Sequence, residues 1–129
     1  MANKEIFHLE YILKTSPKVL EKMITTPDGL SEWLADDVNV KNDIYTFIWD
    51  GSEEEARLIS KKTGEGIRLH WVHDEDEDED TYIEMCYTID PLTKAVIFRI
   101  TDFAEPSELQ TTQRMWESHV GDLRRALGA

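Results

Sequence analysis

Thr26-Pro27-Asp28-Gly29-Leu30-Ser31-Glu32-Trp33-Leu34 is the stretch of this 129-residue chain that decides its fold. A threonine followed by proline is typical of a helix start, because the hydroxyl caps a free backbone N–H and proline lacks one. Leu30, Trp33 and Leu34 then recur at helical spacing. The stretch therefore predicts a short helix with one apolar side.

A second helix start precedes this stretch at Ser16-Pro17, and the helix it opens has an apolar side made of Val19, Leu20, Met23 and Ile24. We call residues 16–34 the clasp, because they predict two short capped helices in direct succession. Before the clasp, residues 5–13 mix β-branched and aromatic side chains with polar ones and predict a strand. Alternation places on one face of that strand Phe7, Leu9, Tyr11 and Leu13.

After the clasp the apolar period changes to two, which predicts strands over residues 37–40, 44–49, 54–61, 66–73, 81–89 and 94–103. The short connections between them favour antiparallel hairpins, because a parallel crossover needs a dozen or more residues. Apolar side chains alternate along four of these strands and predict one continuous face: Tyr45, Phe47, Trp49; Ile67, Leu69, Trp71; Ile83, Met85, Tyr87; Val96, Phe98, Ile100.

The last element predicted is a long helix. Ser107 and Gln110 have the spacing of a capping box, and Gly128 is placed to end the helix after Leu127. Such a helix is roughly 30 Å long, enough to cross a sheet. One side of it carries Leu109, Thr112, Gln113, Trp116, Val120, Leu123 and Leu127.

In this order, the features resemble the START-like (helix-grip, SRPBCC) superfamily, in particular its branch similar to the Hsp90 ATPase activator homologues. The resemblance rests on Pro27, Leu30 and Trp33 in the clasp, with weaker support from the strand that ends at Trp71 and from Trp116 followed by spaced leucines. It implies an α+β helix-grip fold, a curved antiparallel sheet of six or seven strands around a terminal helix. A single domain over residues 1–129 is expected.

The sequence departs from this family in three places. Asn42-Asp43 stands where a Gly-Gly pair is common, and Met115 precedes the helix tryptophan where glycine is common. The eukaryotic co-chaperones of the branch also carry a separate N-terminal domain, whereas this chain begins at the first strand. That last departure argues against a co-chaperone function.

Composition narrows the classes of partner. The net charge is −13, and the basic residues form no phosphate-tracking cluster, so we expect no binding to nucleic acid. No apolar run approaches the roughly 20 residues that span a bilayer, so no membrane insertion is expected. A lone cysteine, Cys86, and the lack of a signal peptide at the start favour the cytoplasm.

The sequence favours no catalytic, metal or cofactor site. The acidic run Asp74–Asp80 lacks the glycine of a calcium loop and is interpreted as a solvated hairpin tip, with a cation site or a basic partner as alternatives. His70 and His73 fall on opposite faces of a strand, which is wrong for zinc, and His8 faces away from the core. Cys86 has no positioned base nearby in sequence. We therefore do not favour an enzyme.

The tryptophans are the best functional candidates. In the helix-grip fold the space between sheet and helix is often not filled, so the inward aromatic and methionine side chains line either a packed core or an adaptable ligand cavity. His119 is placed either inside this space or half-exposed at its edge. The candidate cavity residues are Tyr45, Phe47, Trp71, Met85, Tyr87, Phe98, Met115, Trp116 and His119.

Two functions follow from these patterns. The first is non-enzymatic binding of a small apolar or amphipathic ligand between the sheet and the terminal helix. The alternative is a single-domain interaction protein, related to the Hsp90 activators, with a filled core and an acidic surface for a basic protein partner.

Overall fold

The computed structural model describes residues 4–75 and 80–128. Its elements, in chain order, are β1 (Glu5–Leu13), α1 (Pro17–Thr25), α2 (Pro27–Leu30), β2 (Asp37–Lys41), β3 (Ile44–Trp49), β4 (Ser52–Lys62), β5 (Gly66–Trp71), α3 (Val72–Glu75), β6 (Ile83–Ile89), β7 (Val96–Ala104), the 3₁₀ turn η1 (Pro106–Glu108) and α4 (Leu109–Leu127).

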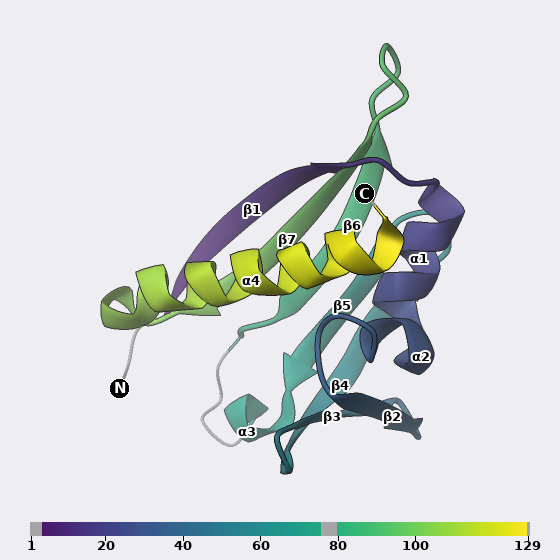
Figure 1. Cartoon of the computed structure of the whole chain (residues 1–129). Helices are drawn as coiled ribbons and strands as arrows, with labels where there is room; N and C mark the ends of the chain where they lie inside the picture. Colours follow the sequence, from purple (N-terminus) through teal and green to yellow (C-terminus); the bar gives the residue numbers. More distant parts are fainter. Residues whose placement is uncertain (1–3, 76–79, 129) are drawn as a thin grey trace.

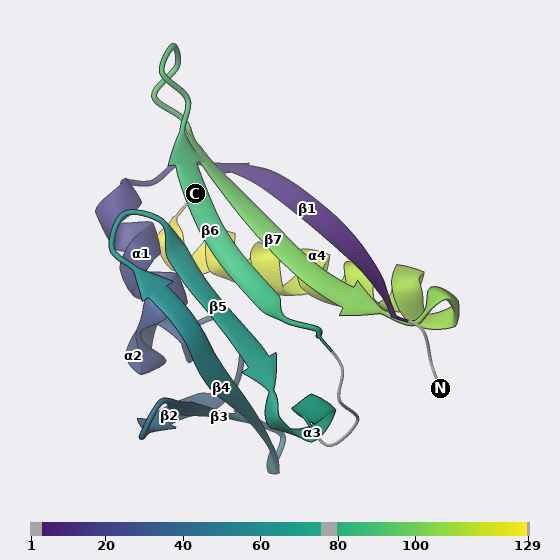
Figure 2. The same ribbon diagram turned by 180° about the vertical axis from the view of Figure 1, so that it is seen from behind.

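The seven strands form one antiparallel sheet in the order β1-β7-β6-β5-β4-β3-β2. Helix α4 crosses one face of this curved sheet, and α1 and α2 lie at the end of the same face where α4 finishes (Figure 1). In the opposite view the strands lie in front of the helices, and the described helices leave most of the outer face of the sheet uncovered (Figure 2). This is the predicted α+β helix-grip arrangement.

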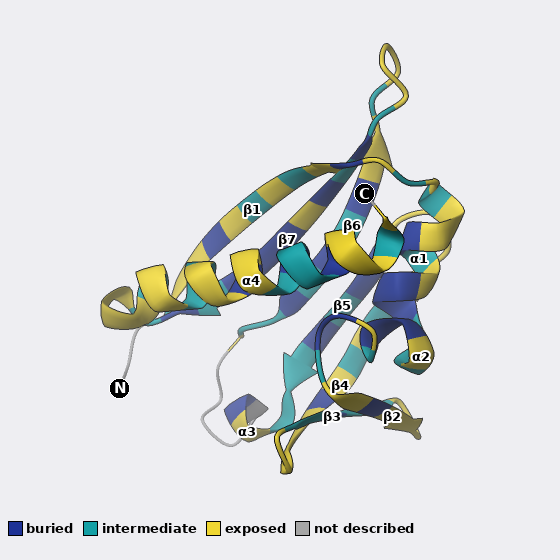
Figure 3. Cartoon of the chain, viewed as in Figure 1, coloured by how far each residue is buried: buried dark blue, intermediate teal, exposed yellow. Residues whose placement is uncertain are grey.

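The inner face of the sheet carries the predicted alternation. Ile100 of β7 pairs with Leu9 of β1 on one side and with Met85 of β6 on the other, and Met85 in turn pairs with Ile67 of β5. Ile100, Met85 and Ile67 are all buried, whereas their neighbours along each strand are more exposed, apart from Thr101 and Gly66 (Figure 3). The apolar period of two thus predicted which face of these strands is buried.

Both helix starts of the clasp form as predicted, but α2 ends at Leu30, so Trp33 and Leu34 lie in the turn after it and not on the side of a helix. The Ser16 hydroxyl accepts a hydrogen bond from Val19 N at 3.2 Å, and the Thr26 hydroxyl accepts one from Gly29 N at 3.0 Å, so both short helices are capped by their own side chains. Trp33 is buried and its indole Nε1–H donates to the Met23 carbonyl oxygen at 2.8 Å. Val19 is an exception, since its side chain is exposed and not part of the apolar side.

Two further local predictions were wrong. Ser107 does not cap α4, because Pro106 opens a 3₁₀ turn in which Ser107 is an interior residue, and the helix begins only at Leu109, with no capping side chain. The strand predicted to reach His73 ends at Trp71, where the chain turns into α3. The predicted end of α4 is confirmed, since Gly128 adopts a left-handed φ of 70°.

The Asn42-Asp43 departure has a structural explanation. Both residues have positive φ, 52° and 64°, in the tight turn that joins β2 to β3. Left-handed φ at both central positions is what a two-residue hairpin turn of type I′ requires, and Asn and Asp tolerate it better than other residues with a side chain. The pair therefore occupies the turn that a Gly-Gly pair would make.

Candidate functional site

A cavity of about 330 Å³ lies between the sheet and the middle of α4. Its wall on the sheet side comes from the inner faces of β3, β5 and β6, through Phe47, Trp49, Leu69, Trp71, Ile83 and Met85. Its wall on the helix side comes from Met115, Trp116 and His119 of α4. Leu34, Glu54, His73 and Asp102 complete the lining.

Three aromatic rings form the sheet wall. Phe47 stacks on Trp49 with ring centroids 5.6 Å apart, and it meets Trp71 edge to face at 5.7 Å. The Trp49 indole donates its N–H to the Leu34 carbonyl oxygen at 2.6 Å, which fixes the ring against the end of the clasp. Phe47 is buried, but Trp49 and Trp71 are only half-buried. The wall thus leaves aromatic surface facing the cavity.

On the helix side, Trp116 is the deepest residue. It is 2% exposed, and its indole N–H donates to Oδ2 of Asp102 at 2.8 Å. His119 lies one turn later with its ring 6.1 Å from that of Trp116. Burial lowers the pKa of His119 and outweighs the effects of Asp122 and the Trp33 backbone, which raise it. The lowered pKa favours a neutral ring. Met115 is 45% exposed and stands at the edge of the cavity.

Among the described residues, Asp102 is the one carboxylate buried in the cavity wall, with 8% of its surface exposed. Burial raises its pKa to about 6, although the hydrogen bonds from Trp116 and from the Phe103 backbone N–H oppose that change. Sequence reasoning missed this residue. The signal was present, because Asp102 continues the inward series of Val96, Phe98 and Ile100 at the same period of two.

Six of the nine predicted cavity residues line this space: Phe47, Trp71, Met85, Met115, Trp116 and His119. The other three, Tyr45, Tyr87 and Phe98, lie outside it. The Tyr45 hydroxyl donates to the Thr25 carbonyl oxygen at 3.1 Å, and the Tyr87 hydroxyl donates to the Glu21 carboxylate at 3.3 Å.

Phe98 packs edge to face on Trp33 at 6.0 Å. Contacts with α1 or with the end of the clasp thus hold Phe98 and both tyrosines. Clasp residues contact this part of the inner face, and Leu34, the last residue of the clasp, lines the cavity.

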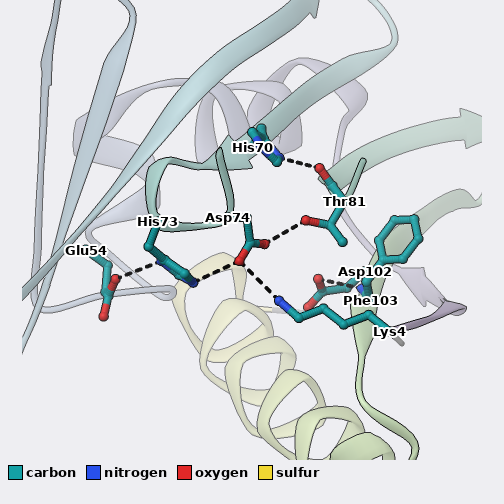
Figure 4. A network of polar contacts seen from close by, with 8 residues as sticks. All are labelled: Lys4, Glu54, His70, His73, Asp74, Thr81, Asp102 and Phe103. Carbon is teal, nitrogen blue, oxygen red and sulfur yellow. Dashed lines mark hydrogen bonds and ion pairs between the residues drawn. The ribbon is translucent and has the colours of Figure 1, made fainter. Parts of the chain in front are cut away.

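A polar network borders the cavity (Figure 4). Asp74 is 2% exposed and accepts hydrogen bonds from the Lys4 ammonium at 3.1 Å and the Thr81 hydroxyl at 2.6 Å. His73 lies between two carboxylates, 3.2 Å from Asp74 and 3.5 Å from Glu54. The solvated-tip interpretation is therefore wrong for Asp74, while residues 76–79 of the acidic run lie outside the described residues.

The remaining histidines and the cysteine lie away from the cavity lining. His8 is exposed and hydrogen-bonds the Thr101 hydroxyl at 2.9 Å, and His70 bonds the Thr81 carbonyl oxygen through Nδ1. Burial raises the pKa of the Cys86 thiol, which disfavours the reactive thiolate. Within residues 4–75 and 80–128, no group of three or more His, Cys, Asp or Glu side chains is placed to hold a metal ion.

Asp74 is expected to stabilise the fold. Asp74→Asn removes the charge that Lys4 faces, so it should lower the free energy of unfolding at pH 7 by about 1–3 kcal/mol, the cost of a lost buried charged partner. Burial raises the pKa of this carboxyl, but the hydrogen bonds from Thr81 and Lys4 outweigh burial and lower it below its usual value.

A lowered pKa sets the pH dependence of this effect. The stabilisation should be complete above the ordinary pKa near 4 and lost as the pH falls through the folded-state pKa. Urea melts from pH 7 down to pH 3 should therefore show wild type and Asp74→Asn converging in acid. Asp80→Asn, in the same acidic run but exposed, is the control. An equal loss in both variants, or no convergence, would contradict this role.

The chain belongs to the START-like superfamily, whose domain model matches residues 1–129. An NMR structure of a Bacteroides fragilis protein is 35% identical over 98% of this chain and 92% of that one, with a TM-score of 0.66. The Aha1 dimer from Colwellia psychrerythraea is 17% identical over 95% and 96% of the two chains, with a TM-score of 0.80.

A Bacillus halodurans protein is 12% identical over 98% of this chain and 99% of that one, with a TM-score of 0.76. These last two likenesses concern the fold. A search of curated proteins finds no significant match. In the described part of the chain, none of the helices combines the length and apolarity that crossing a bilayer requires.

Proposed function

We propose that this protein binds a small apolar or amphipathic molecule in the cavity between the sheet and α4, without catalysing a reaction on it. The observation that supports this most is the half-buried aromatic surface of Trp49 and Trp71, which faces a space of about 330 Å³. Covering such surface is favourable by about 25 cal/mol per Å². Membership of the START-like superfamily agrees with a general binding or activator-type role.

The dimensions restrict the ligand. Small-molecule pockets span about 300–1,000 Å³, so this cavity is at the lower end of that range. One fused aromatic ring system or a short alkyl chain suits it better than a long acyl chain. Met115 at the edge is flexible and adapts to related shapes, which favours tolerance over tight selection.

A second candidate is a protein-binding role. Ile6 and Ile12 are exposed at 48% and 65% on β1, which is an edge strand of the sheet. Edge strands with exposed apolar side chains are available to partner chains. A partner with a basic surface would also complement the net charge of −13.

Ligand binding is tested with N-phenyl-1-naphthylamine, an uncharged apolar fluorophore. It is expected to bind with micromolar affinity and to brighten as it leaves water. Met115→Trp should weaken binding by about tenfold or more, close to 1.4 kcal/mol, because the larger side chain occupies the cavity edge.

Thr111→Trp is the matched control, since Thr111 is an exposed residue of α4 outside the cavity lining. It adds the same ring to the same helix and should leave the affinity unchanged. Absence of binding up to about 1 mM probe, or equal weakening in both variants, would overturn the ligand proposal and leave the protein-binding role.

A further inference from the structure

The charges around the cavity indicate which class of ligand it takes. We infer, building on the proposed function, that the preferred ligand is an aromatic or aliphatic amine, whose cationic end lies beside Asp102 while its apolar body lies against the tryptophans. Four observations carry this inference. They are a second hollow that adjoins the cavity, the balance of charge around both, the free acceptor capacity of Asp102, and the indole rings beside it.

The second hollow is about 220 Å³ in volume and lies next to the apolar cavity. The two spaces share Trp71, His73, Asp102 and Met115 in their linings, so Asp102 stands where they meet. The first space is walled mainly by rings and aliphatic chains, and the second mainly by polar residues. An amphipathic ligand thus has an apolar site and a polar site in contact with each other.

Carboxylates dominate the charged side chains of this lining: Glu54, Asp74, Asp102, Glu105 and Glu108. The basic side chains are Lys4, His73 and His119, and burial favours the neutral form of His119. The Lys4 ammonium lies 3.1 Å from Asp74, so its charge is offset there. A carboxylate or sulfonate on the ligand would meet net repulsion in this region, and a cation would meet attraction.

Asp102 has the acceptor capacity that an amine requires. Its Oδ1 accepts from the Phe103 backbone N–H at 2.7 Å, and its Oδ2 accepts from Trp116. A carboxylate offers about four acceptor positions, so two bonds leave room for a further donor. Hydrogen bonds between an ammonium and a carboxylate are roughly twice as strong as those between neutral groups.

The indole rings add a second attraction for a cation. Trp71 lines both spaces together with Asp102, whereas Trp116 presents its N–H edge to that carboxylate. A cation within about 6 Å of an indole face gains roughly 0.5–2 kcal/mol, more where water is excluded. An ammonium where the two spaces meet would therefore have the Asp102 carboxylate and the Trp71 ring in one lining.

The test compares three ligands that share one ring system: 1-naphthylmethylamine, 1-naphthylmethanol and 1-naphthylacetate. Isothermal titration calorimetry should give the amine an affinity about tenfold or more above that of the alcohol, and the acetate the weakest affinity. The net charge of −13 attracts any cation at long range, so the series is repeated at about 1 M salt, where the Debye length is about 3 Å. The order should persist there.

Asp102→Asn should bring the amine within about twofold of the alcohol, while Asp28→Asn, which removes an exposed charge outside the cavity, should not. The three-ligand series uses the unaltered protein, so it decides the matter even if Asp102→Asn fails to fold. If the alcohol binds and the amine binds no more tightly, the charge inference is wrong and the ligand proposal stands. If none of the three binds, the ligand proposal itself fails.

Discussion

Trp33→Ala is expected to lower the free energy of unfolding by about 3–5 kcal/mol, the range for truncating a large buried aromatic side chain. Trp33 is 3% exposed, so its removal leaves a cavity the size of an indole beneath the clasp. Two specific contacts are lost with it. These are the edge-to-face contact with Phe98 and the hydrogen bond from Nε1 to the Met23 carbonyl oxygen.

The measurement is urea unfolding followed by far-UV circular dichroism. The variants are compared where the slope of unfolding free energy against urea concentration is the same as in the wild type. Trp33→Phe separates the contribution of ring packing from that of the hydrogen bond, because it keeps a ring in the space but removes the indole donor. It should lower the free energy of unfolding by less than the alanine variant does. Leu92→Ala, at a position 91% exposed, should be neutral within about 0.5 kcal/mol. A loss below about 1 kcal/mol for Trp33→Ala would contradict the packing of the clasp.

Gly29→Ala is expected to lower the free energy of unfolding by about 3 kcal/mol or more, at the upper end for overpacking. The atoms that the new methyl group would meet belong to the backbone of α1, so they cannot move without moving the helix. A Cβ at residue 29 would lie 2.0 Å from the Lys22 carbonyl oxygen and 2.6 Å from the Met23 Cα, and both atoms belong to the backbone of α1. The two short helices would have to separate. The separation would also disturb the Met23 carbonyl oxygen that Trp33 bonds.

Gly121→Ala is the matched control for this variant. Gly121 lies within α4, and a Cβ there meets no atom within 4 Å. Alanine is favoured over glycine inside a helix by about 1 kcal/mol, so Gly121→Ala should stabilise the protein. Opposite signs for the two substitutions in thermal or urea melts are the expected result. Similar effects at both positions would contradict the close approach of α1 and α2.

Local patterns predicted most of the fold because its elements have strong local signals. The two hydroxyl-proline starts and the spacing of Leu30, Trp33 and Leu34 placed the clasp, and period-two alternation placed the inner face of the sheet. The start of α4 was not predicted correctly. Ser107, inside the 3₁₀ turn that Pro106 opens, and Gln110 have the same spacing as a capping box, so the sequence pattern did not distinguish the turn from a capped helix start.

The candidate site was harder to predict because its composition depends on contacts between distant segments. Alternation shows that Tyr45 and Phe47 face inward, but not that the first bonds the clasp and the second lines the cavity. The burial of Asp74 depends on Lys4, 70 residues away, so the acidic run alone indicated a solvated loop. The period of two in β7 places Asp102 on the inward face. It was not predicted because acidic residues at inward positions were not considered as cavity residues.

The ligand proposal is tested most directly by the indole N–H signals of the four tryptophans in a ¹⁵N-¹H correlation spectrum, during titration with uncharged 1-naphthylmethanol. Trp49, Trp71 and Trp116 line the cavity, whereas Trp33 lies outside its lining and under the clasp. We predict saturable shifts of the first three signals with one common affinity, while the Trp33 signal stays in place. Unchanged indole signals at millimolar ligand, or a shift confined to Trp33, would contradict the proposal that this cavity binds a small molecule.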